Sequence, residues 1–178
     1  MIETIALVLT GLSITASIIY YANILSNANK AQQIQLEKRE LDQFMSLSKQ
    51  LGTQENWERY VEVVYNIQCK DFDEFIEEYG PNTNPSDYAK VCSLWYDFTI
   101  IGDLVFNGTF SLEQVFWLVA DMPVRTWDKW GSIIHELREH VGSPDAYLAF
   151  DYLASELRRH IDSDSHKDTL NRMRKSIT

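Results

Sequence analysis

Residues 4–25 read TIALVLTGLSITASIIYYANIL and contain no charged side chain. A helix rises about 1.5 Å per residue, so a run of about 20 apolar residues crosses the ~30 Å hydrocarbon core of a bilayer. A secretory signal would start with basic residues, but Met1, Ile2 and Glu3 include none. A buried core helix is the other alternative, yet this helix would be hydrophobic all round, which favours lipid. We therefore predict a transmembrane helix within residues 1–25.

The charges that flank this run predict its orientation. No Lys or Arg precedes it, whereas Lys30, Lys38 and Arg39 come after it. Because basic residues are enriched on the cytoplasmic side, we expect a single-pass membrane protein with its N-terminus outside and its C-terminal domain in the cytoplasm. Tyr20 and Tyr21 are expected to be interface anchors, since an aromatic ring can be half buried there while its hydroxyl group stays hydrated.

Small and hydroxyl-bearing residues recur along one face of the predicted span. They are Ala6, Thr10, Ser13 and Ser17, at steps of four, three and four residues. Between helices in lipid, such a face permits close backbone approach and interhelical hydrogen bonds. The alternative is that the hydroxyl groups bond to carbonyls of their own helix. We interpret these residues as a membrane packing face, which implies a partner helix from a second copy or from another protein.

The rest of the sequence predicts helices and no strands. Residues 26–51 lack Pro and Gly and are rich in helix-forming residues, so the span is expected to continue as a juxtamembrane stalk helix. An α-helical cytoplasmic domain comes next over residues 52–162, and residues 163–178 form a polar C-terminal tail with one short helix. The predicted fold class is all-α: a transmembrane helix that continues into a stalk, then a compact bundle of five or six helices.

Local signals divide the predicted domain into separate amphipathic helices. In the first of them, residues 57–68, three- and four-residue steps predict one buried face. That face consists of Trp57, Tyr60, Val61, Val64 and Ile67. The boundary signals are Ser86 as an N-cap, Asn107-Gly108 as a turn, Ser111 with Gln114 as a capping box, and Pro123 near a helix start.

Composition and motif spacing exclude several classes of function. The net charge of −10 argues against nucleic-acid binding, which needs clustered Lys and Arg. Cys69 and Cys92 are too few for a disulfide scaffold, and they are expected to pack as small hydrophobic residues. His135 and His140 are five residues apart, so they do not share a helix face as zinc ligands would. We predict no catalytic, cofactor or metal site, although this does not decide whether the protein is an enzyme.

Tryptophan and arginine residues are the remaining candidates for a functional surface. The tryptophans are expected in the core, and Trp127 or Trp130 would indicate a docking surface if either were exposed. Arg125 and Arg138 are candidate anion ligands, with ion-paired or solvated arginine as the alternative.

Several segments carry a resemblance to a protein family. They are the span and stalk, YDFTIIGDLVFNGTFSLEQVFWL at 96–118, RTWDKW at 125–130, HELRE at 135–139 and GSPDAYLAFDYLA at 142–154. In this pattern the chain resembles a family of uncharacterised small proteins of archaea and bacteria. Those proteins have one N-terminal transmembrane helix and a helical domain of unknown function. The resemblance implies the same architecture and brings no catalytic residues with it.

These observations lead to three hypotheses for function. The leading one is a membrane-anchored, non-enzymatic scaffold or accessory subunit that contacts lipid and assembles with itself or within a membrane complex. The second is a membrane-tethered sensor or enzyme with a small-molecule pocket inside the bundle. The third is a channel lined by the hydroxyl face of several spans, which has no charge to select ions.

Overall fold

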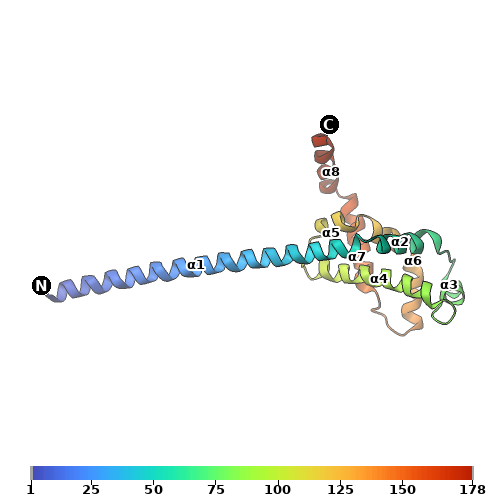
Figure 1. Cartoon of the computed structure of the whole chain (residues 1–178), viewed down its shortest axis with the longest axis horizontal. Coiled ribbons are helices and arrows are strands. Elements are labelled where there is room, and N and C mark those ends of the chain that lie inside the picture. The colour runs from blue at the N-terminus through green and yellow to red at the C-terminus, as the bar shows by residue number, and fades with distance from the viewer. Residues whose placement is uncertain (1, 178) are drawn as a thin grey trace. The chain divides into compact units, whose positions relative to one another are not determined.

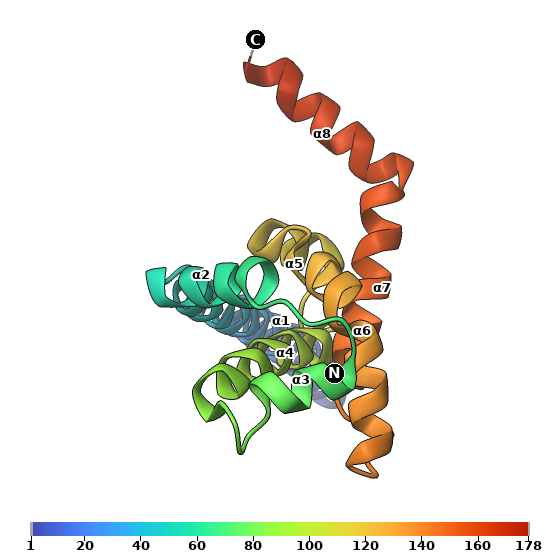
Figure 2. The ribbon, with the colours of Figure 1, turned by 90° about the vertical axis from the view of Figure 1, so that its right-hand side faces the viewer.

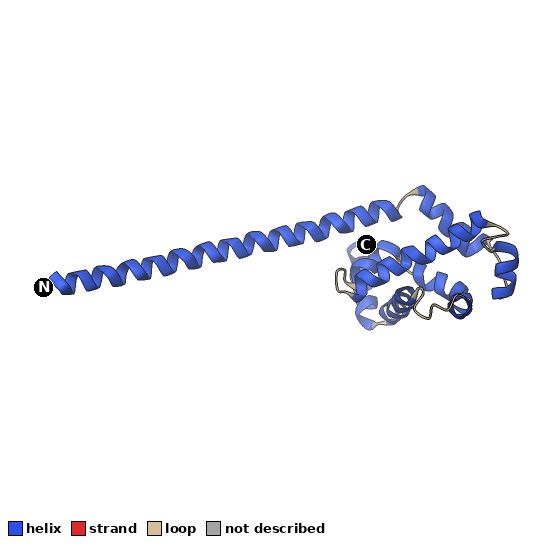
Figure 3. Cartoon of the chain, turned by 90° about the horizontal axis from the view of Figure 1, so that it is seen from below, coloured by secondary structure: helices blue, strands red, loops and turns tan. Residues whose placement is uncertain are grey.

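All regular elements of the described chain are helices (Figure 3). The computed structural model describes the backbone of residues 2–177 and the side chains of residues 20–177. Within this range no strand occurs, which confirms the all-α fold class. The elements are α1 (Ile2–Leu51), α2 (Gln54–Val61), the π-helix η1 (Glu62–Asn66), α3 (Phe72–Tyr79), α4 (Pro85–Phe106), α5 (Leu112–Val119), α6 (Met122–His140), α7 (Leu148–Asp162) and α8 (Asp164–Ile177) (Figure 1).

The chain divides into two units, Met1–Lys49 and Gln50–Thr178. The first unit is formed by α1 up to Lys49, and α1 is a single helix without interruption over the predicted span and stalk. No helix among residues 20–177 is long and apolar enough to cross a membrane. Most of the predicted span lies outside these residues. The packing face of Ala6, Thr10, Ser13 and Ser17 lies entirely outside them.

The second unit is organised around a close approach of α4 and α7. Gly102 is buried in α4, and a Cβ atom at this position would lie 2.0 Å from the carbonyl oxygen of Ala149 in α7. Only glycine lets the two backbones come this close. Beside this contact the rings of Phe98 and Phe150 are 5.3 Å apart, and both are buried. The resulting α4–α7 pair is the most extensive helix contact of the unit.

An aromatic cluster forms the other part of the core. Trp95 of α4 lies 5.6 Å from Trp130 of α6, between ring centroids, and Phe75 of α3 contacts both rings. All three side chains are fully buried, so two of the tryptophans are core residues as predicted. Trp57 and Trp117 are not, because 51% and 47% of their surfaces are exposed.

The predicted face of residues 57–68 is only partly correct, because the helix changes its period. α2 gives way to the π-helix η1, in which each turn holds an additional residue. Val63 and Val64 are therefore buried together, while Val61 is exposed. Lys129 of α6 stabilises the end of η1 by donating from its Nζ atom to the carbonyls of three residues. These are Val63 at 3.1 Å, Val64 at 2.9 Å and Ile67. Burial lowers the pKa of Lys129.

The helix boundaries agree with most of the local signals. Ser111 and Gln114 form the predicted capping box, and Gly108 adopts a left-handed conformation with φ of 71° in the predicted turn. Pro123 lies in the first turn of α6. The N-cap of α4 is Asn84, whose side chain accepts from the amide of Asp87. The prediction of Ser86 was wrong because Pro85, which lacks an N–H, fits the first helical position.

Residues 164–177 form α8, a longer helix than the short one expected in the polar tail. Its buried residue is His166, which is 5% exposed. The His166 ring lies 4.3 Å from Phe116 of α5 and 4.8 Å from His160 of α7, between ring centroids. Beyond this contact α8 extends away from the rest of its unit (Figure 2).

We expect Gly102→Ala to destabilise the protein by about 2 kcal/mol or more, because the added methyl group meets backbone and forces α4 and α7 apart. The free energy of unfolding of the full chain in detergent, from urea titration, measures this. Gly131→Ala is the matched control. There the new Cβ meets a side chain, that of Trp127, at 3.1 Å and not backbone at 2.0 Å, so a smaller displacement is needed and the loss should be smaller. Equal losses would contradict a special role for the α4–α7 approach.

We also expect the contact of α8 to weaken in mild acid. Burial and the neighbouring His166 lower the pKa of His160 below its usual 6.5, and Glu113 of α5 opposes this shift. In mild acid the unfolded state therefore binds more protons than the folded state. The stability that neutral His160 contributes to the folded state is complete above about pH 6.5 and is lost as the pH falls further. Urea titrations between pH 7.5 and 5.5 should show a smaller loss for His160→Gln than for the wild type.

Candidate functional site

The four residues predicted as a docking or ligand surface lie along α6, but they do not form one surface. Trp130 is fully buried in the aromatic cluster, and Trp127 is half-buried with its ring against Phe150. Arg125 is exposed and pairs with Asp121 at 2.6 Å, one turn earlier in the chain. Arg138 is buried. These positions fit a packing role for Trp130 and an ion-paired surface role for Arg125.

Arg138 holds the loop between α6 and α7. Its Nε atom donates to the carbonyl of Ala146 at 2.7 Å, and Nη1 lies 3.1 Å from Nδ1 of His135 and 3.6 Å from the carboxylate of Asp151. The guanidinium carbon lies 5.8 Å from the centroid of the Trp127 ring. Arg138 therefore joins α6, the loop and α7 at one point.

A surface cavity of about 440 Å³ beside Arg138 does not favour an anion. Its lining residues are His135, Arg138, Glu139, Gly142 and Pro144. The charge of Arg138 is already balanced by Asp151, and Glu139 adds a negative charge to the rim. A second anion would be repelled by these carboxylates. An ion pair with Asp151 therefore explains the position of Arg138 better than a role as an anion ligand does.

The interior of the helical unit is filled by side chains. The largest of them, each less than 2% exposed, are Trp95, Trp130, Phe75, Phe98 and Phe150. Interlocking rings of this size leave little room for a ligand between the helices. Among the described residues, no group of His, Cys, Asp and Glu could hold a metal ion.

Both cysteines are free thiols within the described residues. Burial raises the pKa of the Cys69 thiol to about 11. Burial also raises the pKa of Cys92, which contacts Tyr88 and Tyr147. Both groups therefore stay protonated at neutral pH, which fits the predicted role as small packing residues and makes them weak nucleophiles.

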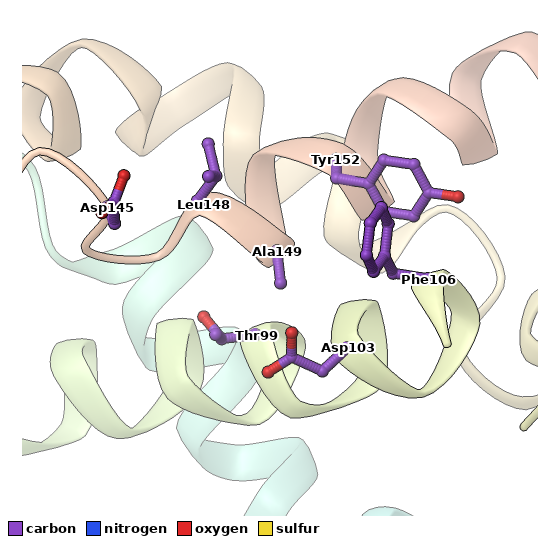
Figure 4. A pocket seen from close by; sticks show the side chains of 7 residues that line it. All are labelled: Thr99, Asp103, Phe106, Asp145, Leu148, Ala149 and Tyr152. Atoms are coloured by element: carbon purple, nitrogen blue, oxygen red, sulfur yellow. The ribbon is translucent and has the colours of Figure 1, made fainter. Parts of the chain in front are cut away.

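The feature that suggests function is a groove on the outer side of α4 and α7. It has a volume of about 460 Å³ and is mostly apolar. Its lining residues are Thr99, Asp103, Phe106, Asp145, Leu148, Ala149 and Tyr152. Figure 4 shows Ala149 between the two helices, with the rings of Phe106 and Tyr152 together at one end. These two rings meet edge to face, with their centroids 5.4 Å apart.

The local sequence explains the shape of the groove. Gly102 and Ala149 are small, so the helices approach closely and leave a shallow floor. At the start of α7, Tyr147 adopts a left-handed conformation with φ of 57°, and its ring packs 5.4 Å from Trp95. This turn places Leu148 on the outer side of the helix, where it is 52% exposed.

The exposed face of α4 continues the apolar surface of the groove. Phe106, at the end of the helix, is 69% exposed, and Tyr96 and Ile100 are exposed on the same side. Asp103 and Asp145 supply the charge at the groove, and both are exposed. This surface, which we call the α4–α7 groove, is therefore apolar with an acidic rim. Sequence reasoning missed it, although apolar residues on both sides of the helix at 87–106 were a visible signal.

No family model, curated protein or solved structure matches the chain. The resemblance to small membrane-anchored helical proteins therefore stays a prediction, and the function must be argued from the residues themselves.

We expect Arg138→Ala to destabilise the protein by about 1–3 kcal/mol, because it removes the bond to Ala146 and leaves Asp151 without its ion pair. Thermal unfolding followed by tryptophan fluorescence measures the change. The control is Arg125→Ala, which removes an exposed ion pair and should change stability by less than about 0.5 kcal/mol. A similar small change in both variants would show that Arg138 does not hold the loop.

Proposed function

We propose that this protein is a membrane-anchored, non-enzymatic helical module that assembles with itself or with a membrane partner. The observation that carries the proposal is the α4–α7 groove, an apolar recess on the outside of a domain whose interior is filled. Apolar side chains exposed together on a folded domain are typical of a surface that is covered in an assembly.

The membrane part of the proposal rests on the sequence. Residues 4–25 carry no charge, and the first basic residues come after the run. Two further features support it. Tyr20, Tyr21 and Leu25 are more than 60% exposed on α1, and the helix runs on without a break. Side chains of this kind are stable at a bilayer interface, where the rings and the aliphatic group leave water.

A sensor or enzyme with a pocket inside the bundle is less well supported. The side chains that could line such a pocket pack against one another, and the Nε and Nη1 atoms of Arg138 are engaged by Ala146, His135 and Asp151. A channel would depend on side chains of the span that lie outside residues 20–177, so no observation favours it.

Membrane anchoring is tested by changing the predicted span. We expect the full chain to remain in the membrane fraction after an alkaline carbonate wash. The double variant Leu9→Lys with Ile14→Lys should be released, because each charge at the centre of a span costs about 3 kcal/mol. For orientation, Ser165→Cys in a Cys69→Ser, Cys92→Ser background should react with an impermeant maleimide only after the cells are opened. Release of the wild-type chain by carbonate would overturn the anchoring.

Assembly is tested by native mass spectrometry of the full chain released from nanodiscs. We expect an oligomer or a complex with another protein. A strictly monomeric chain that carries no partner would contradict the proposed function.

A further inference from the structure

The apolar stripe of α8 has a partner at its start, but its last two residues are exposed. His166, Leu170, Met173 and Ile177 succeed one another at steps of four, three and four residues, which places them on one face. His166 packs against α5 and α7, but farther along the same face Met173 and Ile177 are 44% and 84% exposed. The face that attaches α8 to the domain therefore continues into solvent.

The charges beside this stripe are basic. Arg172 and Arg174 flank Met173 on its two sides, Lys175 lies on the opposite side of the helix, and residues 171–177 include no acidic residue. The α4–α7 groove has the opposite character, since Asp103 and Asp145 are the charged residues that line it. The chain has a net charge of −10, so two copies repel each other unless oppositely charged surfaces meet. The end of α8 and the groove form such a pair, each with an apolar centre.

The groove of one chain is not within reach of its own α8. The groove includes the first turn of α7, at Leu148, Ala149 and Tyr152, whereas α8 begins beyond the opposite end of that helix. From Tyr152 to Asp162 the helix extends about 15 Å. The contact of His166 with Phe116 then fixes the start of α8 on the α5 side, from which it extends away from the domain (Figure 2).

We propose that α8 of one copy binds in the α4–α7 groove of a second copy. The Met173–Ile177 end of the stripe would cover Leu148 and the ring pair of Phe106 and Tyr152, with its basic residues beside Asp103 and Asp145. In a twofold dimer the contact forms twice, once in each direction. This inference rests on the proposed function, because it names the partner as a second copy.

Sedimentation equilibrium of the full chain in detergent micelles tests the inference. We expect a monomer–dimer equilibrium. Leu148→Glu and Met173→Glu should each raise the dissociation constant about tenfold or more, because each places an unpaired charge in an apolar contact. Leu148→Glu lies in the first turn of α7, where an acidic residue is compatible with the helix. Added salt should also weaken the dimer.

Two variants serve as matched controls. Asn171→Glu makes the same kind of change on another side of α8, and Glu77→Lys changes the charge of an exposed residue in α3. Both should leave the dissociation constant within about twofold of the wild type. If Leu148→Glu and Met173→Glu behave like these controls while an oligomer persists, the inference is wrong and the proposed function stands. A monomer that binds a different protein would also contradict the inference and leave the proposed function standing. A monomer without any partner would contradict both the inference and the proposed function.

A cross-link in nanodiscs identifies what covers the stripe. One tagged copy carries Leu148→Cys and the other carries Met173→Cys, both in a Cys69→Ser, Cys92→Ser background. We expect a disulfide between the two copies in neutral and in anionic lipid. A basic amphipathic helix can also bind an anionic membrane surface. Loss of the cross-link in anionic lipid alone would therefore assign the stripe to lipid and overturn the inference.

Discussion

The approach of α4 to α7 at Gly102 is the constraint on which the helical unit depends. Because glycine has no side chain, the carbonyl of Ala149 can occupy the space where a Cβ would lie. The approach allows Phe98 to meet Phe150 and leaves a shallow floor on the outer side. The same contact thus determines both the packing of the core and the shape of the groove.

Helix content and most helix ends were predictable because their causes are local. Ser111 and Gln114 are three residues apart, and a capping box needs nothing else. Asn107-Gly108 is a turn in almost any context, since Gly108 accepts a positive φ. The N-cap of α4 was missed by two residues because Asn84, Pro85 and Ser86 are all plausible at a helix start, and the choice among them depends on one hydrogen bond.

Tertiary features were much harder to predict. A three- and four-residue pattern identifies Trp57 and Trp117 as apolar, but it cannot show that about half of each side chain stays exposed in the fold. The α4–α7 groove depends on residues that are almost fifty positions apart, Gly102 and Ala149, and on the turn at Tyr147. Arg138 likewise acquires its role from Ala146 and Asp151, which only the folded loop brings to it.

The π-helix η1 also bears on how this chain accepts changes in length. One more residue per turn is what a single insertion in an α-helix produces. Here the carbonyls displaced by the wider turn find a donor in Lys129, from a distant helix. Deleting one residue between Glu62 and Asn66 would restore regular winding and leave α2 nearly in phase with the segment that leads into α3, because the wider turn already absorbs the additional residue. The displaced carbonyls would then bond within the helix. The ammonium group of Lys129 would then lose its acceptors. The number of residues in η1 is therefore coupled to the presence of a lysine more than sixty positions away.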